Sequence, residues 1–441
     1  MMRRFLALIV RIFFRRVGIT GAEHVPRTGP VLLLLNHPNS LVDPLFLLAL
    51  APRRVVFLAK EPLFRIPIIG AIARAMGSIP VYRRMDGADT AQNRKTFEKV
   101  WEELGRGGAI ALFPEGTSHS DPKMRPFKTG TARIALGAMS MNPGLPVQVI
   151  PGGLYYTSKV RFRSSALLCF GNPVAVPSEP LGPDGEPLPD SVRALTARLQ
   201  EALASVTIQA DEEEALKLVT RAERIFSSVE GPGTQDRDLK RQFELRQRFL
   251  RGYTQLRTQM PERIAQVEGM LARYDAELAT AGMAPENLLE SKLTVGMVMT
   301  NAAIAVATLM VLAPLGIAGI AINIIPYQFL VPLVTRVARV EHDVLATAKI
   351  FASIAAFPLV WTLLAFFVWQ RWGIWVAAAV WIAMPICGVI AVRFLERLDR
   401  LVGSARGLSL RLFRPRAFRR LEVQRRKIRD AILEMDGMID P

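Results

Sequence analysis

The residues best suited to chemistry are a histidine and an aspartate, His37 and Asp43, in the stretch Asn-His-Pro-Asn-Ser-Leu-Val-Asp-Pro at 36–44. A histidine backed by a carboxylate is the minimal device for taking a proton from a hydroxyl. The carboxylate fixes the imidazole tautomer and stabilises the cation that forms, as in hydrolase triads. We therefore predict that His37, one of only four histidines in the chain, is a general base and that Asp43 is its partner.

Both residues also have plainer interpretations. A loop histidine can do no more than satisfy hydrogen bonds, and an aspartate followed by Pro44 is typical of a helix N-cap with proline at the first helical position. One carboxylate is able to fill both roles. The sequence leaves these alternatives open for Asp43, whereas the motifs described below favour catalysis for His37.

Strands of a predicted α/β domain position this pair. Five consecutive apolar residues, Val31–Leu35, precede His37 and are typical of a central strand covered on both faces. His37 then lies at the carboxyl end of that strand, where open α/β sheets bind their ligands. A second strand, Ala109–Phe113, leads into Pro-Glu-Gly-Thr-Ser at 114–118 and brings these residues to the same edge. Further strands are predicted at Val55–Ala59, Gln148–Pro151 and Ala166–Phe170.

Four blocks of sequence resemble, in order and spacing, the motifs of the glycerolipid acyltransferase superfamily, the fold of glycerol-3-phosphate and lysophosphatidate acyltransferases. Together they cover residues 20–175, which is under half of the chain. Each block alone is weak evidence, but four in the right order are strong. The blocks are Asn36-His37 to Asp43-Pro44, Lys60–Gly70 running on to Gly77–Arg84, Phe113–Ser118, and Val149–Gly153.

One departure from this pattern concerns the acceptor. The family usually leaves four residues between the histidine and the aspartate, and this chain leaves five. The longer spacing, followed by Val-Asp-Pro, resembles a branch that includes fungal-type glycerol-3-phosphate and dihydroxyacetone-phosphate acyltransferases. It favours glycerol 3-phosphate as the acceptor and leaves lysophosphatidate, or another lysophospholipid, as the alternative.

The resemblance also implies roles for polar residues near the acceptor. The third block of the family contacts glycerol phosphate, which assigns substrate binding to Glu115, Gly116, Thr117 and Ser118. Glycine allows close backbone approach, and the two hydroxyls are able to donate hydrogen bonds to phosphate. The plainer interpretation of this block is a tight turn.

Arginine forks match phosphate well, so basic residues near the blocks are candidates for phosphate contacts. Arg83 is the first choice and Arg65 the second, although a single arginine is more often a solvated surface charge. His119 is interpreted as structural. The remaining basic candidates are Arg84, Arg125 and Lys128.

An acyl-CoA, or an acyl carrier protein, is the acyl donor that the resemblance implies. Its thioester already carries the activation energy, so no bound cofactor is expected. The sequence has no Walker A motif, no Rossmann glycine pattern and no metal-ligand spacing. The expected partners are membrane phospholipids, acyl-CoA and a phosphorylated glycerol acceptor, and the sequence does not indicate an oligomeric state.

The overall composition is that of a basic membrane protein. The 441 residues carry a formal net charge of +17, with 50% hydrophobic and 22% charged residues. Basic chains bind nucleic acid, anionic membranes or anionic substrates. Here the positive charge gathers at the ends of long apolar segments, without the aromatic-basic interleaving of a base-stacking surface, so nucleic acid is not expected. A non-catalytic membrane scaffold is the alternative of another class, and the intact motifs argue against it.

The domain organisation follows from the same patterns. Residues 1–19 are too short to span a membrane and carry arginines at their edges, which predicts an interfacial amphipathic helix. We expect the acyltransferase domain at 20–200, a helical linker region at 201–290, a membrane domain of about four helices at 294–393, and a basic cytoplasmic tail at 394–441. The predicted spans are Val295–Ala313, Leu315–Val334, Phe351–Trp369 and Trp372–Val392, with breaks at Pro314 and at Gln370-Arg371. The second of them is the least certain to span and is a candidate for a re-entrant segment.

Charge predicts the orientation of this membrane domain. The tail after Arg393 is rich in arginine, and the positive-inside rule places it in the cytoplasm. Two helical hairpins with both ends cytoplasmic satisfy this rule. The chain is therefore expected to be an integral membrane protein whose active domain faces the cytoplasm, in the inner membrane if the source is bacterial.

Overall fold

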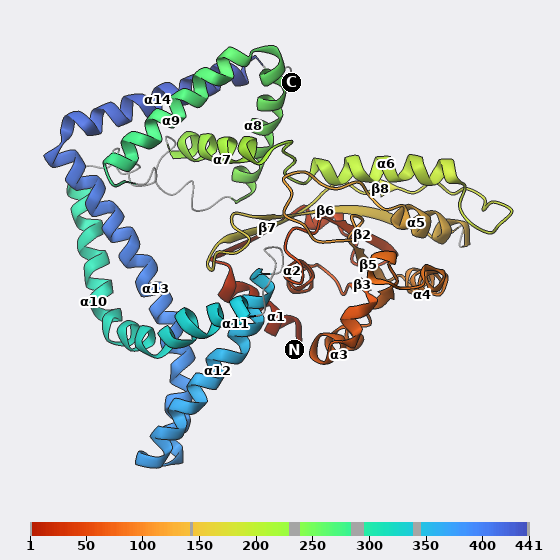
Figure 1. The fold of residues 1–441 in the computed structure, drawn as a ribbon, viewed down its shortest axis with the longest axis horizontal. Coiled ribbons are helices and arrows are strands. Elements are labelled where there is room, and N and C mark those ends of the chain that lie inside the picture. The colour runs from red at the N-terminus through yellow and green to blue at the C-terminus, as the bar shows by residue number, and fades with distance from the viewer. Residues whose placement is uncertain (1, 142–143, 229–238, 284–294, 338–344, 439–441) are drawn as a thin grey trace. The chain divides into compact units, whose positions relative to one another are not determined.

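The computed structural model describes all residues except 1, 142–143, 229–238, 284–294, 338–344 and 439–441. It contains two compact units, which are described separately. One comprises Met1–Asp211 with His342–Thr347, and the other comprises Glu212–Glu341 with Ala348–Pro441. Figure 1 shows the sheet of the first unit and the long helices of the second.

The first unit is built on an eight-stranded sheet in the order β1-β7-β6-β2-β5-β3-β4, with β8 paired to β6. The central strand β2 pairs in parallel with both β5 and β6, so the carboxyl ends of these three strands lie at the same edge. β7 and β8 run antiparallel to β6. The strands are β1 Arg16–Thr20, β2 Val31–Leu35, β3 Val56–Lys60, β4 Ile79–Val81, β5 Ala109–Leu112, β6 Gln148–Tyr156, β7 Ser165–Phe170 and β8 Val174–Ala175.

The five predicted strands are present, and the α/β prediction is confirmed. The strand predicted to end at Pro151 continues to Tyr156, because Gly152 and Gly153 stay in the ladder and pair with β7. Gly153 is required there, since a Cβ at this position would lie 1.7 Å from the carbonyl oxygen of Val206. The strands β1, β4 and β8 were not predicted.

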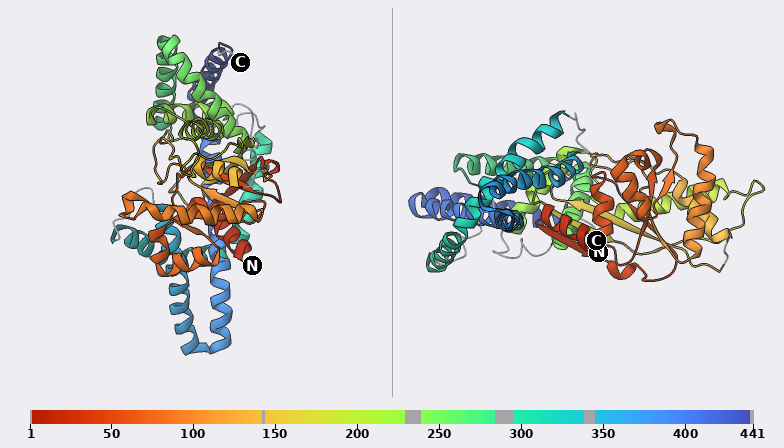
Figure 2. Two further views of the ribbon diagram at one scale, coloured as in Figure 1. Left: turned by 90° about the vertical axis from the view of Figure 1, so that its right-hand side faces the viewer. Right: turned by 90° about the horizontal axis from the view of Figure 1, so that it is seen from below.

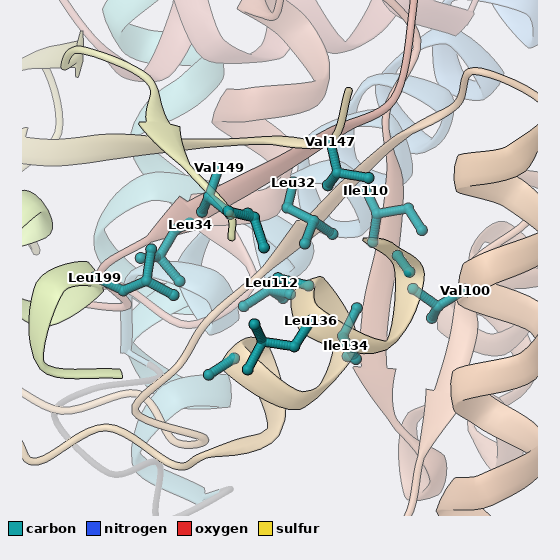
Figure 3. Close-up of a cluster of buried hydrophobic side chains, with 14 of the residues drawn as sticks. Leu32, Leu34, Val100, Ile110, Leu112, Ile134, Leu136, Val147, Val149 and Leu199 are labelled. Atoms are coloured by element: carbon teal, nitrogen blue, oxygen red, sulfur yellow. The ribbon is translucent and has the colours of Figure 1, made fainter. Parts of the chain in front are cut away.

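Burial of β2 on both faces explains its central place. Leu32 and Leu34 pack into a core with the helices α5 and α6, and Figure 3 shows these side chains with those of β5 and β6. Leu33 and Leu35 alternate to the opposite face and are also fully buried. The helices of this unit are α1 Met2–Phe13, α2 Val42–Leu50, α3 Pro67–Ala75, α4 Asn93–Gly105, α5 Gly130–Met141 and α6 Pro189–Ser205.

The second unit begins with charged helices that form a core with the last helix of the chain. Leu271 and Tyr274 are fully buried there, and Leu421 and Ile428 pack into the same cluster. The residues after Arg414, expected as a basic tail, thus form a helix with one buried face. These helices are α7 Glu213–Ser228, α8 Leu239–Gln259, α9 Pro261–Thr280 and α14 Pro415–Asp436.

Among the described residues, three helices are long and apolar enough to cross a membrane: Thr300–Leu333, Thr347–Trp372 and Ile374–Phe413. The predicted break at Pro314 is wrong, because α10 Val295–Ile325 continues through this proline. A proline in an apolar helix removes one backbone hydrogen bond and bends the helix without ending it, and Figure 1 shows that α10 is bent. A π-helical turn, Pro326–Leu330, then joins α10 to α11 Val331–Val337.

The second break was predicted at Gln370-Arg371, but α12 Leu345–Trp372 includes these residues, and the break before α13 Ile374–Phe413 lies at Gly373. The left view of Figure 2 shows α12 and the first part of α13 side by side, as a helical hairpin. α13 continues well beyond the predicted end at Val392. Within the hairpin, Trp381 Nε1 donates to Thr362 Oγ1 over 3.3 Å.

Small residues let α10 approach α13 closely. A Cβ on Gly319 would lie 2.1 Å from the carbonyl oxygen of Cys387, and a Cβ on Gly316 would lie 3.0 Å from Phe394. Because the residue number rises along α10 as it falls along α13, the two helices run antiparallel. Asn323 of α10 also accepts a hydrogen bond from Trp361 Nε1 of α12 at 2.9 Å. Close packing at glycine and interhelical hydrogen bonds are typical of helices that associate in lipid.

Candidate active site

The predicted histidine lies just beyond the carboxyl end of β2. His37 Nδ1 is 2.8 Å from Asp43 Oδ2. The imidazole stacks on Phe113, which follows the neighbouring strand β5, with ring centroids 3.9 Å apart and an angle of 12° between the planes. The side chain keeps 18% exposure, and no group in the described part of the chain hydrogen-bonds Nε2. The ring is therefore oriented by protein at Nδ1 and open at Nε2.

The carboxylate of Asp43 is completely buried and accepts hydrogen bonds at both oxygens. Oδ2 accepts from the backbone N–H of Asn39 at 2.7 Å as well as from His37. The alternative role as a helix N-cap is not supported, because α2 begins at Val42, its N-cap is Leu41 and no side chain caps it. Asp43 instead closes the loop that carries His37.

The loop accommodates its five-residue spacing through one left-handed residue. Ser40 has φ 46°, a region that non-glycine residues rarely adopt. The neighbouring Asn39 is buried, and its Nδ2 donates to the carbonyl of Lys159 at 3.2 Å. The turn at Ser40 therefore lets the Asn39 N–H and the His37 ring reach the same oxygen of Asp43.

Tyr156 is a site residue that the sequence analysis missed. It ends β6, the other neighbour of β2, and its hydroxyl donates to Asp43 Oδ1 over 2.7 Å. Burial, followed by the charge of Asp43 and this hydrogen bond, raises the pKa of Tyr156 well above its ordinary value. The signal that was missed is the continuation of a strand through Gly152-Gly153, which we took as its end.

The third block leaves the sheet from β5, at the same edge as His37. Gly116 has φ 75°, which favours glycine, and its carbonyl accepts a hydrogen bond from Arg83 Nη1. Lys128 lies alongside, with its Cγ 3.6 Å from the place that a Cβ on Gly116 would occupy. The guanidinium of Arg83 and the stem of the Lys128 side chain therefore both lie at Gly116.

The Glu115 carboxylate is turned inward and makes protein contacts. It is 3% exposed, binds the ring Nε2 of His119, and accepts from the backbone N–H of Arg125 at 2.7 Å. The backbone N–H of His119 in turn donates to the carbonyl of His37 at 3.2 Å. Glu115 and His119 thus join the third block to the loop that carries His37, while substrate binding by Glu115 stays a prediction.

Arg83 spans the second and third blocks. Its Nε and Nη2 bind the carboxylate of Asp86 at 2.6 and 2.7 Å, and this pairing holds the pKa of Asp86 below its ordinary value. Three of its five N–H donors serve Asp86 and Gly116, so two remain for a ligand. Arg65 is different: it is 77% exposed and pairs with Glu61 at 2.8 Å.

The two hydroxyls of the third block are half-buried, and Thr117 Oγ1 donates to the carbonyl of Ser118 at 3.3 Å. Within the described ranges, no group of three or more histidine, cysteine, aspartate or glutamate side chains is placed to hold a metal ion. The arrangement at the sheet edge can therefore remove a proton at His37 Nε2, on the same edge as the third block, whose Gly116 carbonyl binds Arg83. That is the chemistry of a hydroxyl on an anionic substrate.

Comparison with known proteins adds two family matches. Residues 16–154 match the protein-family model described as Acyltransferase. Residues 230–441 match the model described as Glycerol-3-phosphate acyltransferase 2 C-terminal domain. The first match contains His37, Asp43, Arg83 and Gly116, and it ends at Leu154, two residues before Tyr156.

Three curated relatives come from yeasts. Glycerol-3-phosphate O-acyltransferase 2 of Saccharomyces cerevisiae is 31% identical over 47% of this chain and 27% of its own length. Glycerol-3-phosphate O-acyltransferase 1 of the same organism is 25% identical over 97% of this chain and 69% of its own length. An uncharacterized acyltransferase of Schizosaccharomyces pombe is 25% identical over 63% of this chain. The chain spans about half of that protein, 53% of its length.

Proposed function

Since the chain belongs to the glycerolipid acyltransferase superfamily, we propose that it is a membrane acyltransferase that transfers a fatty acyl group to a hydroxyl of glycerol 3-phosphate in phospholipid synthesis. The observation that carries this proposal is the His37–Asp43 pair, hydrogen-bonded at 2.8 Å with Nε2 open at the edge of the sheet. The proposed acyl donor is acyl-CoA or an acyl carrier protein. The C-terminal match to a glycerol-3-phosphate acyltransferase domain supports glycerol 3-phosphate over lysophosphatidate as the acceptor.

The proposed reaction proceeds by general-base catalysis. The hydrogen bond to Asp43 Oδ2 keeps the proton of neutral His37 on Nδ1, so the lone pair of Nε2 accepts the proton of the acceptor hydroxyl. The hydroxyl oxygen attacks the thioester carbonyl, forming the new C–O bond. Collapse of the tetrahedral intermediate breaks the C–S bond, and the proton passes from His37 to the departing thiolate. Asp43 stabilises the imidazolium between these two steps, and Phe113 keeps the ring in place.

Phosphate recognition is proposed for the cations around Gly116. Arg83 retains two free N–H donors of its fork, and Lys128 adds a second charge beside the same turn. The backbone of Gly116, with no side chain, admits a phosphate oxygen close to the chain. Thr117 and Ser118 are proposed to donate their hydroxyls to the same group. Arg65 is proposed as a secondary phosphate contact, because its exposed side chain can reach a phosphate of the acyl donor or of the acceptor only from the surface.

Membrane attachment is proposed for both ends of the chain. The hairpin of α12 and α13 exposes Trp369, Trp372 and Trp375 at its turn, by 50%, 65% and 86%. Tryptophans at this position are typical of a membrane interface, and the basic residues at the other ends, Lys349 and Arg393, favour the cytoplasmic side. In the first unit, α1 exposes the apolar stripe Phe5, Leu8 and Ile12, which supports an interfacial helix. The active domain would then face the cytoplasm.

An acceptor panel tests the proposal. The protein purified in detergent is supplied with a labelled acyl donor, either acyl-CoA or acyl carrier protein, and, in parallel, with glycerol 3-phosphate, dihydroxyacetone phosphate or lysophosphatidate. The expected result is labelled lysophosphatidate from glycerol 3-phosphate at the highest rate. Faster transfer to lysophosphatidate would move the chain to the alternative acceptor, and no transfer from acyl-CoA or acyl carrier protein to any of the three would refute the proposal.

A further inference from the structure

We infer that Tyr156 is a positioning residue of the His37–Asp43 pair, and that its hydroxyl lowers the proton affinity of His37 by sharing the charge of Asp43. Tyr156 does not touch the reacting atoms and acts through the carboxylate. The inference rests on the proposed function for its meaning in catalysis. The coupling between the Tyr156 phenol and the His37 imidazole through the buried Asp43 carboxylate does not depend on which substrate the protein uses.

The hydrogen bonds around Asp43 carry this inference. Three donors converge on one carboxylate that is 0% exposed: the Asn39 N–H at 2.7 Å, His37 Nδ1 at 2.8 Å and the Tyr156 hydroxyl at 2.7 Å. The first two share Oδ2, whereas Tyr156 alone serves Oδ1. Without water around it, the negative charge of Asp43 is distributed only among these three donors.

The phenol ring is fixed where it can play this part. It stacks on Phe14 with centroids 5.5 Å apart and an angle of 28°, and it meets Phe46 edge-on at 6.0 Å. Phe46 belongs to α2, the helix that carries Asp43, and Phe14 follows α1. Tyr156 therefore ties β6, α2 and the end of α1 to the catalytic carboxylate, and its hydroxyl has no freedom to leave Asp43.

The protonation state of Tyr156 makes it a constant donor. Burial and the adjacent charge of Asp43 raise its pKa well above the ordinary value. The phenol therefore stays protonated over the whole pH range in which a histidine titrates, and it cannot itself produce a step in the pH–rate profile. Its effect is instead a constant offset of the pKa of His37.

The sign of that offset follows from the geometry. A proton donated to Oδ1 withdraws negative charge from Oδ2, which weakens the attraction between Asp43 and a protonated His37. Removing the hydroxyl restores that charge and favours the imidazolium. Tyr156→Phe should therefore raise the pKa of His37, and the acid limb of the activity profile should move to higher pH.

Other charged and titratable groups lie around the pair, and the substitution leaves them in place. His119 donates its backbone N–H to the His37 carbonyl, and its ring contacts Glu115 and, at 3.4 Å, Asp121. Arg83 binds the Gly116 carbonyl on the side of the third block, and Lys159 accepts from Asn39 through its backbone oxygen. Because Tyr156 contacts none of these groups, a difference between Tyr156→Phe and wild type reports the lost hydroxyl.

A histidine titration in the full-length protein tests the inference without relying on turnover. The protein is labelled at the imidazole Cε1 of histidine and titrated by NMR in detergent, with the His37 signal identified by its loss in His37→Gln. We expect the pKa of His37 in Tyr156→Phe to rise by about half a unit to one unit. The matched control is Tyr253→Phe, which removes a hydroxyl that donates to Glu268 at 3.3 Å in the second unit and should leave the His37 titration unchanged.

The dependence of activity on pH, and a variant with a stronger phenol donor at position 156, complete the test. A one-unit rise lowers activity about tenfold at pH values below the midpoint of the acid limb and changes the plateau much less. If Tyr156→Phe fails to fold, 3,5-difluorotyrosine at position 156 keeps the ring and donates more strongly, so the pKa of His37 should fall. An unchanged His37 pKa in the phenylalanine variant, or in the fluorinated variant, overturns the inference even when the wild type transfers acyl groups. A shifted pKa in a protein without any acyl transfer supports the coupling and refutes the proposed function instead.

Discussion

Replacing Asp43 with asparagine separates the charge of this residue from its shape. In the native loop, Oδ2 accepts from Asn39 N–H and His37 Nδ1, and Oδ1 accepts from the Tyr156 hydroxyl. The amide oxygen of asparagine can replace Oδ2 toward the first two donors. The amide NH₂ then faces Tyr156, whose hydroxyl oxygen is also able to accept. This arrangement keeps the tautomer of His37 and removes the negative charge, but it also reverses the hydrogen bond between Tyr156 and residue 43 and leaves the phenol proton without its native acceptor.

The size of the effect can be worked out from that arrangement. A hydrogen bond to a charged group contributes about 1.5–3 kcal/mol, and each 1.36 kcal/mol is tenfold in rate. Loss of the charge alone should therefore slow the reaction by roughly 10- to 150-fold. If the amide turns over, its NH₂ meets two N–H donors and imposes the wrong tautomer on His37, which in the triad precedent costs about 10⁴-fold. We expect turnover to fall by at least about 100-fold, which lies between the loss expected from the charge alone and the loss expected from the wrong tautomer.

The assay measures turnover and melting temperature on the same Asp43→Asn preparation. No helix cap is lost, because α2 has Leu41 at its N-cap and no side-chain cap, so the melting temperature should stay within a few degrees of wild type. Asp275→Asn is the matched control, since it removes a carboxylate that pairs with Arg221 in the second unit. Normal turnover in Asp43→Asn would show that the carboxylate only braces the loop and would refute the reasoning.

Three further predictions concern the surroundings of the pair. Arg83→Gln should raise the KM for glycerol 3-phosphate about 10- to 100-fold, as expected for the loss of a charge-assisted phosphate contact of about 1.5–3 kcal/mol; an equal rise in the KM for acyl-CoA would remove this assignment. Gly116→Ala should lower the free energy of unfolding by about 1–2 kcal/mol, because φ is 75° there, and denaturant unfolding without a change would contradict this strain. The third variant is Arg371→Cys in a chain whose Cys169 and Cys387 have been replaced. Its thiol should react with an impermeant reagent only from the side of the membrane opposite the active domain. Labelling from the cytoplasm would overturn the proposed orientation of the α12–α13 hairpin.

The parts of the site that sequence reasoning predicted are those with a simple local pattern. An uninterrupted apolar run of five residues is typical of a strand buried on both faces, and Val31–Leu35 is fully buried as β2. Polar blocks that follow two such strands meet at one edge of the sheet when the strands are parallel neighbours. β2 and β5 are parallel neighbours. The membership of the superfamily inferred from four ordered motifs is likewise confirmed by the family matches.

The parts that were missed depend on contacts between segments far apart in the chain. Tyr156 reaches Asp43 across 113 positions, after a Pro-Gly-Gly sequence that reads locally as the end of a strand. The contacts of the Glu115 carboxylate with the His119 ring and the Arg125 backbone likewise have no local signal, while substrate binding by Glu115 stays a prediction. For Asp43 the sequence left a helix N-cap as the alternative to its predicted role as the partner of His37, because Pro44 follows it; in the structure the helix has already begun at Val42.

The membrane helices show a different limit of sequence reasoning. Pro314 was taken as a break because proline disrupts helices in water. In a long apolar helix the peptide groups have no alternative partner, so continuing the helix costs less than ending it. The structure accordingly has one bent helix through Pro314, and its described residues form three long apolar helices where about four were expected.

The most direct test of the account is the turnover of His37→Ala with acyl-CoA and the acceptor that wild type prefers. The account predicts a loss on the order of 100- to 10,000-fold, as expected for removal of a general base, with unchanged membrane insertion and melting behaviour. His24→Ala is the matched control, because the ring of that histidine contacts the carbonyl of Phe170, at 3.3 Å, in the same unit and outside the blocks that form the candidate site. More than half of the wild-type rate in His37→Ala would contradict the account, whatever the other variants show.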